Sequence, residues 1–98
     1  IRLQAEADHT NLTEHHSYDV ALVRIRAVDA HGNVLPFYQE PVRITAEGDI
    51  AIIGPDTIAL QGGIGGTYVK STGRSGRGAL LLQSQTAGEI RIPFQIKI

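Results

Sequence analysis

The chain has 98 residues, which is enough for one domain whose core buries roughly 60–65% of the unfolded surface. The absence of cysteine excludes disulfides and thiolate metal sites, so apolar burial has to supply the stability. Nine Lys and Arg residues nearly balance ten Asp and Glu residues, which gives no electrostatic case for a nucleic-acid or membrane-surface partner.

The chain begins at Ile1 and contains no methionine. We therefore expect a fragment of a longer protein, forming a single domain over residues 1–98. No apolar run approaches the ~18 residues needed to cross a bilayer, and the first residues lack the basic and then apolar layout of a signal peptide. Any targeting signal is expected on the rest of the parent protein.

Alternation of apolar and polar residues, typical of β-strands, runs through the whole chain, and no segment is apolar at helical spacing. Within residues 19–29, Ala21, Val23, Ile25 and Ala27 fall on one face, and Leu22, Arg24 and Arg26 fall on the other. Residues 89–98 show the cleanest alternation, and Pro93 within them indicates an edge position or an outward-facing backbone nitrogen. About seven or eight strands are predicted, at residues 1–7, 19–29, 34–35, 42–47, 50–53, 68–71, 79–84 and 89–98.

Glycine, proline and Asx residues separate these strands. Residues 29–33 predict an Asx-type chain reversal, and residues 54–56 predict another turn. The glycine-rich residues 62–66 fit neither phosphate-loop pattern, so we interpret them as relief of crowding where the chain crosses between sheets. Residues 73–78 are basic and glycine-rich but lack interleaved aromatics, and we interpret them as part of a polar hairpin loop.

Two apolar sheet faces of this kind have to cover each other. The sequence therefore predicts an all-β, immunoglobulin-like antiparallel β-sandwich, with the sheets about 10 Å apart. A small closed barrel is the alternative. A true antibody-type domain is excluded, because the chain has no cysteine and no tryptophan for that core.

Neither metal binding nor catalysis is expected from the sequence. His9, His15 and His16 lie close together, but no acidic or cysteine ligands complete a set, so a polar loop is the better interpretation and no cofactor is predicted. Glycoside hydrolysis needs two carboxylates facing each other across a cleft, whereas the acids here are scattered near predicted turns and strand ends. No serine has a nucleophile context such as Gly-x-Ser-x-Gly.

Three aromatic residues, Phe37, Tyr38 and Tyr68, are candidates for contact with carbohydrate or with another protein surface. Amphipathic aromatic rings suit half-exposed positions where sugar rings stack. Packing in the core or at an interface is the more ordinary role of such rings, and we favour it.

Residues 19–84 resemble the C-terminal immunoglobulin-like domain of family 2 glycoside hydrolases, the β-galactosidase and β-glucuronidase type. The resemblance covers about two thirds of the chain and depends on structural positions. These are the Asp29-x-x-Gly32-Asn33-x-x-Pro36 turn, Pro41-Val42, Ile53-Gly54-Pro55 and the passage from Leu60-x-Gly62-Gly63 into Tyr68-Val69.

The resemblance implies a non-catalytic accessory domain of a bacterial enzyme of carbohydrate metabolism, because in that family the catalytic residues lie on a separate TIM barrel. The implied partners are other domains of the same parent chain, and another subunit or carbohydrate are further candidates. The compartment, cytoplasmic or periplasmic, would follow the parent enzyme. Invasin-type immunoglobulin-like repeats share the Asp29 to Pro36 turn, so an adhesin repeat is an alternative, as is a carbohydrate-binding module.

Overall fold

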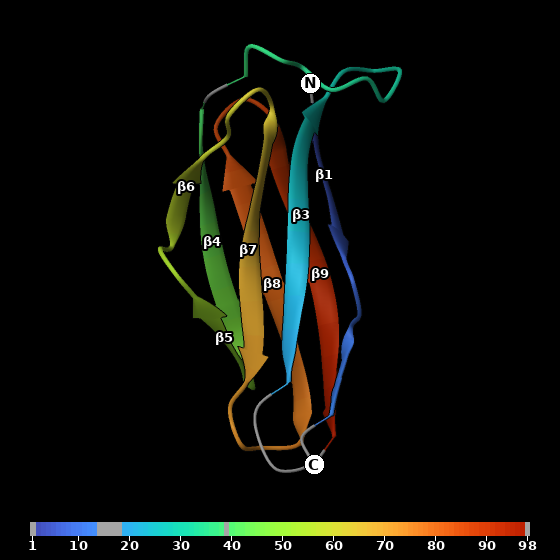
Figure 1. The fold of residues 1–98 in the computed structure, drawn as a ribbon, viewed down its shortest axis with the longest axis vertical. Helices are drawn as coiled ribbons and strands as arrows, with labels where there is room; N and C mark the ends of the chain where they lie inside the picture. Colours follow the sequence, from blue (N-terminus) through green and yellow to red (C-terminus); the bar gives the residue numbers. More distant parts are fainter. Residues whose placement is uncertain (1, 14–18, 39, 98) are drawn as a thin grey trace.

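The computed structural model of the protein describes residues 2–13, 19–38 and 40–97. Two β-sheets pack face to face in an elongated molecule of 42 × 24 × 17 Å (Figure 1). Within the described residues the strands are β1 (Arg2–Ala7), β2 (Asn11–Thr13), β3 (Val20–Val28), β4 (Pro41–Gly48), β5 (Ile50–Ile53), β6 (Thr57–Ala59), β7 (Ile64–Ser71), β8 (Gly76–Ser84) and β9 (Gly88–Lys97). No helix in this part of the chain has the length and apolarity to cross a membrane.

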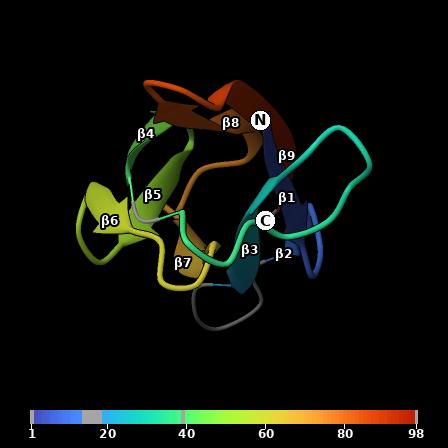
Figure 2. The same ribbon diagram turned by 90° about the horizontal axis from the view of Figure 1, so that it is seen from above.

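One sheet has four strands in the order β1-β3-β7-β5, and the other has five in the order β2-β9-β8-β4-β6. Seen along the long axis, β3 and β7 face β8 and β9 (Figure 2). All pairings are antiparallel except that of β2 with β9. The predicted immunoglobulin-like sandwich is therefore confirmed, and the closed barrel is not formed.

The core lies between the sheets and consists of the residues whose inward position the alternation predicted. In β3, Ala21, Val23, Ile25 and Ala27 are all fully buried, while Arg24 on the opposite face is exposed. The inward residues of β9 meet them from the other sheet, and Phe94 is the largest of the fully buried side chains there. Ile98, predicted on the same face, lies outside the described residues.

Several predicted boundaries differ from the structure. Nine strands occur in the described residues, because β2 and β6 were not counted in the prediction. The predicted strand at Val34 and Leu35 is only an isolated bridge between Val28 and Val34. Strand β7 begins at Ile64 and includes Gly65 and Gly66, so the glycine-rich stretch is partly strand.

The loop between β7 and β8 is not the predicted hairpin. Strand β8 already begins at Gly76, and it belongs to the five-stranded sheet, whereas β7 belongs to the four-stranded one. The loop therefore joins the two sheets. In the described strands the chain changes sheets at every connection except the last, and β8 with β9 forms the one pair of consecutive strands that lie side by side.

Two turn predictions are confirmed. The side chain of Asp29 accepts hydrogen bonds from the backbone N–H groups of His31 (2.8 Å) and Asn33 (3.0 Å), as expected of an Asx turn. Gly62 and Gly63 both have positive φ angles and lie where the chain passes from β6 in one sheet to β7 in the other. A Cβ atom at Gly63 would lie 2.2 Å from the carbonyl oxygen of Leu35, so this close approach requires glycine.

Strand β9 shows why Pro93 is tolerated. Strand β2 pairs with β9 only at residues 95–97, so at Pro93 the described strands flank β9 on one side alone, with β8 opposite it. A residue without a backbone N–H group is acceptable where no neighbouring strand needs that donor.

Candidate functional site

Acidic residues are the first candidates for chemistry, and in the described part of the chain most make isolated surface contacts. Glu6 lies 3.9 Å from Arg26, and Glu47 lies 3.8 Å from Arg91. Glu40 accepts hydrogen bonds from Tyr38 and Thr86. These carboxylates are tied to cations and hydroxyls on separate strands, which is an arrangement for surface structure rather than for a pair acting across a sugar.

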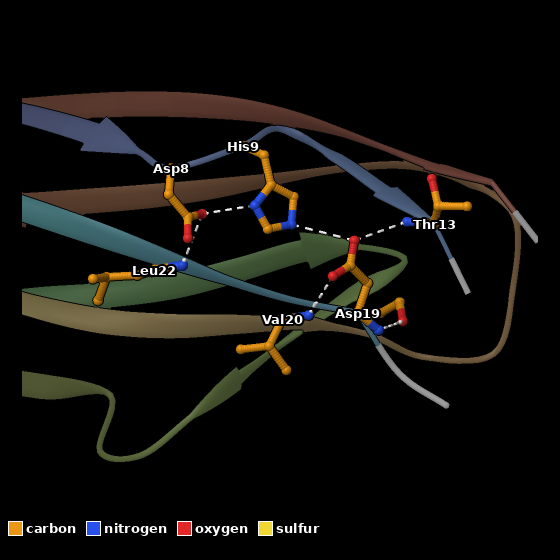
Figure 3. A network of polar contacts seen from close by, with 7 residues as sticks. Asp8, His9, Thr13, Asp19, Val20 and Leu22 are labelled. Atoms are coloured by element: carbon orange, nitrogen blue, oxygen red, sulfur yellow. Dashed lines mark hydrogen bonds and ion pairs between the residues drawn. The ribbon is translucent and has the colours of Figure 1, made fainter. Parts of the chain in front are cut away.

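Among the residues that the structure describes, Asp8 and Asp19 are a pair of acids linked through a shared residue, His9 (Figure 3). His9 Nδ1 lies 2.8 Å from Asp8 Oδ1, and His9 Nε2 lies 3.2 Å from Asp19 Oδ2. Asp8 Oδ1 also accepts a hydrogen bond from the backbone N–H of Leu22 (3.1 Å). Because both ring nitrogens already face carboxylates, the imidazole has no nitrogen left to act on a substrate.

Asp19 is held by backbone donors as well as by His9. Its side chain accepts hydrogen bonds from the N–H groups of Thr13 (3.0 Å) and Val20 (2.9 Å). Burial raises the pKa of Asp19, but the Thr13 hydrogen bond, the charge and hydrogen bond of His9 and the Val20 hydrogen bond outweigh it and lower the pKa below 3.8. The network ties the end of β1 and the end of β2 to the start of β3.

A metal site is not formed by these residues. The described residues contain no group of three or more His, Asp or Glu side chains arranged to hold a metal ion. His9 contacts Asp8 and Asp19 instead, and His15 and His16 lie outside the described residues.

The three candidate aromatics occupy three different environments. Tyr38 is 9% exposed, and its hydroxyl group contacts Glu40, Ser84 and Thr86, which joins the loop before β4 to the β8–β9 hairpin. Phe37 is 93% exposed, and Tyr68 is half exposed on β7. The backbone carbonyl of Tyr38 accepts a hydrogen bond from the N–H group of Gly63, just before β7. Tyr68 lies five residues further along, which is roughly 17 Å of strand, so the Tyr38 and Tyr68 rings belong to separate regions. No single stacking platform results.

Shallow cavities lie on the five-stranded sheet; a small one of about 130 Å³ is lined in part by Glu47 and Arg91, and two others are larger. One, of about 470 Å³, is lined by polar and apolar residues of β2, β8 and β9, including Asn11, Leu12, Arg77, Gln95, Ile96 and Lys97. The other, of about 430 Å³, lies beside β4, β6 and β8. Among the described residues, neither lining includes an aromatic ring or a carboxylate, which are the groups that sugar binding and glycoside hydrolysis use most.

The sequence analysis missed an apolar surface on the four-stranded sheet. Leu22 on β3 and Ile53 on β5 lie opposite Tyr68 on β7, one on either side, and Val20 lies diagonally beside Tyr68. Leu22 is half-buried and the other three are exposed, and we call these four residues the apolar face. The signal was present, because Val20 and Leu22 occupy outward positions of a strand whose next outward residues are arginines.

Comparison with known proteins identifies the family. Residues 3–97 match the sequence model described as "Glycoside hydrolase family 2 C-terminal domain 5". The chain is 34% identical over 94 residues to a β-galactosidase of Rhizobium radiobacter, covering 96% of this chain and 67% of that protein. It is 44% identical over 63 residues to a β-galactosidase of Rhizobium meliloti, covering 64% of this chain and only 8% of that protein.

Solved structures agree on the fold. A family 2 glycosyl hydrolase from Bacteroides cellulosilyticus superposes with a TM-score of 0.92 at 20% identity, over 99% of this chain and 14% of that one. A β-glucuronidase from Parabacteroides merdae superposes with a TM-score of 0.77 at 16% identity, over 96% of this chain and 12% of that one. The resemblance noted for residues 19–84 thus extends over nearly the whole chain, and the chain belongs to glycoside hydrolase family 2, as its C-terminal domain 5.

Proposed function

We propose that the chain is the non-catalytic accessory domain of a β-galactosidase-like enzyme, and that it stabilises that enzyme by packing against its other domains. The observation that carries the proposal is size: the chain spans 67% of the Rhizobium radiobacter β-galactosidase, but only 8% and 10% of those from Rhizobium meliloti and Thermoanaerobacter pseudethanolicus. The carboxylates support it, because hydrolysis of a glycosidic bond needs two of them at one cleft, whereas the linked pair of described acids, Asp8 and Asp19, is bonded to His9.

The test compares three proteins: the 98-residue chain, the full-length product of its gene, and that product with residues 1–98 deleted. A chromogenic β-galactoside should be hydrolysed by the full-length protein and not by the chain. The deletion should lower the midpoint of thermal inactivation, because it exposes surface that the domain covers. Turnover by the chain alone, or a deletion without effect on activity and stability, would contradict the proposal.

Carbohydrate binding is a second candidate, and the observation that favours it is the 93% exposure of Phe37. A fully presented ring can stack on a sugar without any change in the fold. Titration of the chain with galactosides and polysaccharides, followed by NMR of the aromatic side chains, tests it. Saturable shifts that disappear in Phe37→Ala would support binding, and unchanged spectra would remove this candidate.

A further inference from the structure

The apolar face runs across three strands of one sheet. Tyr68 lies at its centre, with Leu22 opposite on one side and Ile53 on the other. Val20 is 41%, Ile53 43% and Tyr68 50% exposed. Since the residues come from β3, β5 and β7, the surface exists only when the sheet is assembled, and Figure 1 shows β3 and β7 in front of β8 and β9.

The side chains of the apolar face lie outside the core of the domain. The core is filled from the opposite side of the same strands, where Ala21, Val23 and Val69 are fully buried. A sheet with one face in water normally carries polar residues on that face. The outer face of the five-stranded sheet is more polar, with Arg43, Arg91 and Gln95 exposed and the half-buried Leu81 between Thr45 and Arg91. The four-stranded sheet departs from this rule at the apolar face.

Charged residues border the apolar face along β3 and β7, and the half-buried Lys70 lies opposite Val20, two residues after Tyr68 on the same side of the sheet. Arg24 and Arg26 occupy the outward positions of β3 that follow Leu22, and Arg26 pairs with Glu6 on β1 at 3.9 Å. Apolar residues at the centre with ion pairs and charges at the rim are the usual layout of a protein interface. This layout favours a protein surface as the occupant.

The size of the apolar face indicates which kind of protein surface fits it. Four partly exposed Val, Leu, Ile and Tyr residues present on the order of 300 Å². A stable complex between free partners needs about 800 Å² on each side. Contacts between domains of one chain need only about 300–750 Å² on each side, because the linker holds the partners at an effective millimolar concentration.

From this geometry we infer that the apolar face is the surface on which the chain docks against a neighbouring domain of its own polypeptide. The inference rests on the proposed function, since it needs a parent chain with further domains. It goes beyond that function in assigning the contact to the four-stranded sheet and to Tyr68 at its centre. The complementary surface on the neighbouring domain is expected to be apolar, with charges at its edge.

Hydroxyl-radical footprinting of the chain and of the full-length protein, read by mass spectrometry, tests the inference directly. Both Phe37 and Tyr68 are accessible in the chain, and Tyr38 is a buried internal reference. In the full-length protein the oxidation rate of Tyr68 should fall at least about fivefold if docking desolvates it. Equal oxidation of Tyr68 in the two proteins would overturn the inference.

A pair of variants provides the matched control. Ile53→Lys places a charge on the apolar face, and Thr45→Lys places the same charge on the outer face of the other sheet. In the chain alone, both should keep the wild-type urea midpoint. In the full-length protein, only Ile53→Lys should restore oxidation of Tyr68 and lower the temperature of inactivation. Equal behaviour of the two variants in the full-length protein would contradict the assignment of the surface.

Two further outcomes separate the alternatives. If the chain alone dimerises in sedimentation and protects Tyr68 as its concentration rises, the occupant is a second copy and the inference is wrong. If the gene product lacks glycosidase activity while Tyr68 is protected in it, the proposed function fails and the docking surface stands. Glycosidase activity without protection of Tyr68 overturns only the docking surface.

Discussion

Single residues decide where this chain can change sheets. At Gly63 the backbone adopts φ +78° and passes so close to Leu35 that a Cβ atom would lie 2.2 Å from its carbonyl oxygen. Gly32 has a similar angle, φ +82°, but nothing lies within 4 Å of the place a Cβ atom would occupy. The two positions therefore separate the cost of the backbone angle from the cost of the clash.

Gly63→Ala should lower the free energy of unfolding by at least about 2 kcal/mol, because the left-handed backbone angle alone costs roughly 1 kcal/mol and the clash adds to it. Gly32→Ala should cost only about 1 kcal/mol, since it meets no neighbour. Urea denaturation of both variants measures the difference. Equal losses would mean that the chain near Leu35 moves aside freely.

Asp19 is expected to make the fold sensitive to acid. Its pKa is lower in the folded chain than its ordinary value of 3.8. The contribution to stability is therefore complete above the pKa of the unfolded chain and is lost as the pH falls through the lower pKa of the folded chain. The urea midpoint of the chain should accordingly fall as the pH drops below about 4.

Asp19→Asn should flatten this pH dependence, because the amide cannot take up the proton. Hydrogen bonds from Asn33 and His31 similarly lower the pKa of Asp29, which lies at the other end of β3. Asp29→Asn should therefore remove a separate part of the acid-induced loss of stability. In the double variant the two reductions in pH dependence should add. Urea midpoints measured between pH 2 and 6 check this, and identical curves for wild type and Asp19→Asn would contradict it.

Among the elements, β2 is one of the two strands that the sequence analysis did not predict, the other being β6. Strand β2 has three residues and pairs in parallel with the end of β9. Three residues are too few to show alternation, and the pairing joins residues more than 80 positions apart. Its place in the sandwich depends on Leu12, which is fully buried between two exposed neighbours.

Leu12→Ala should cost roughly 2–5 kcal/mol, as expected when a buried leucine is truncated and a cavity remains. Thr13→Ala in the same strand should cost less than about 0.5 kcal/mol, because Thr13 is exposed and its backbone N–H remains available to Asp19. Urea denaturation again provides the measurement. A small loss in Leu12→Ala would show that β2 contributes little to the core.

The longer strands were predictable from the sequence, but the exposure of the candidate aromatic rings was not. Alternation in residues 19–29 correctly identified the inward face of β3, because successive side chains of a strand point to opposite sides. No local pattern distinguishes Phe37 from Tyr38, yet one ring is exposed and the other is buried beneath the β8–β9 hairpin. Contact of Phe37 or Tyr68 with carbohydrate or with a protein surface stays a prediction.

At the scale of the whole molecule, the path of the chain sets the expected folding rate. In the described strands only β8 and β9 pair with their neighbour in sequence, and each other pairing needs a longer loop to close first. Domains dominated by such distant contacts fold in milliseconds to seconds. Stopped-flow refolding from urea should show this timescale, and refolding in microseconds would contradict it.

The sequence by itself determined the longer strands, their inward faces and the turns at Asp29 and Gly62, because side-chain alternation and backbone angles are local properties. It also indicated the family, through turns such as Asp29 to Pro36 that belong to this domain type. Only the tertiary structure decided which sheet each strand joins, how Asp8, His9 and Asp19 meet, and that Leu22, Tyr68 and Ile53 form one surface. The physical reason is that strand pairing depends on hydrogen bonds and packing between residues far apart in the chain. A local sequence pattern does not specify which pair of strands forms the most stable contact.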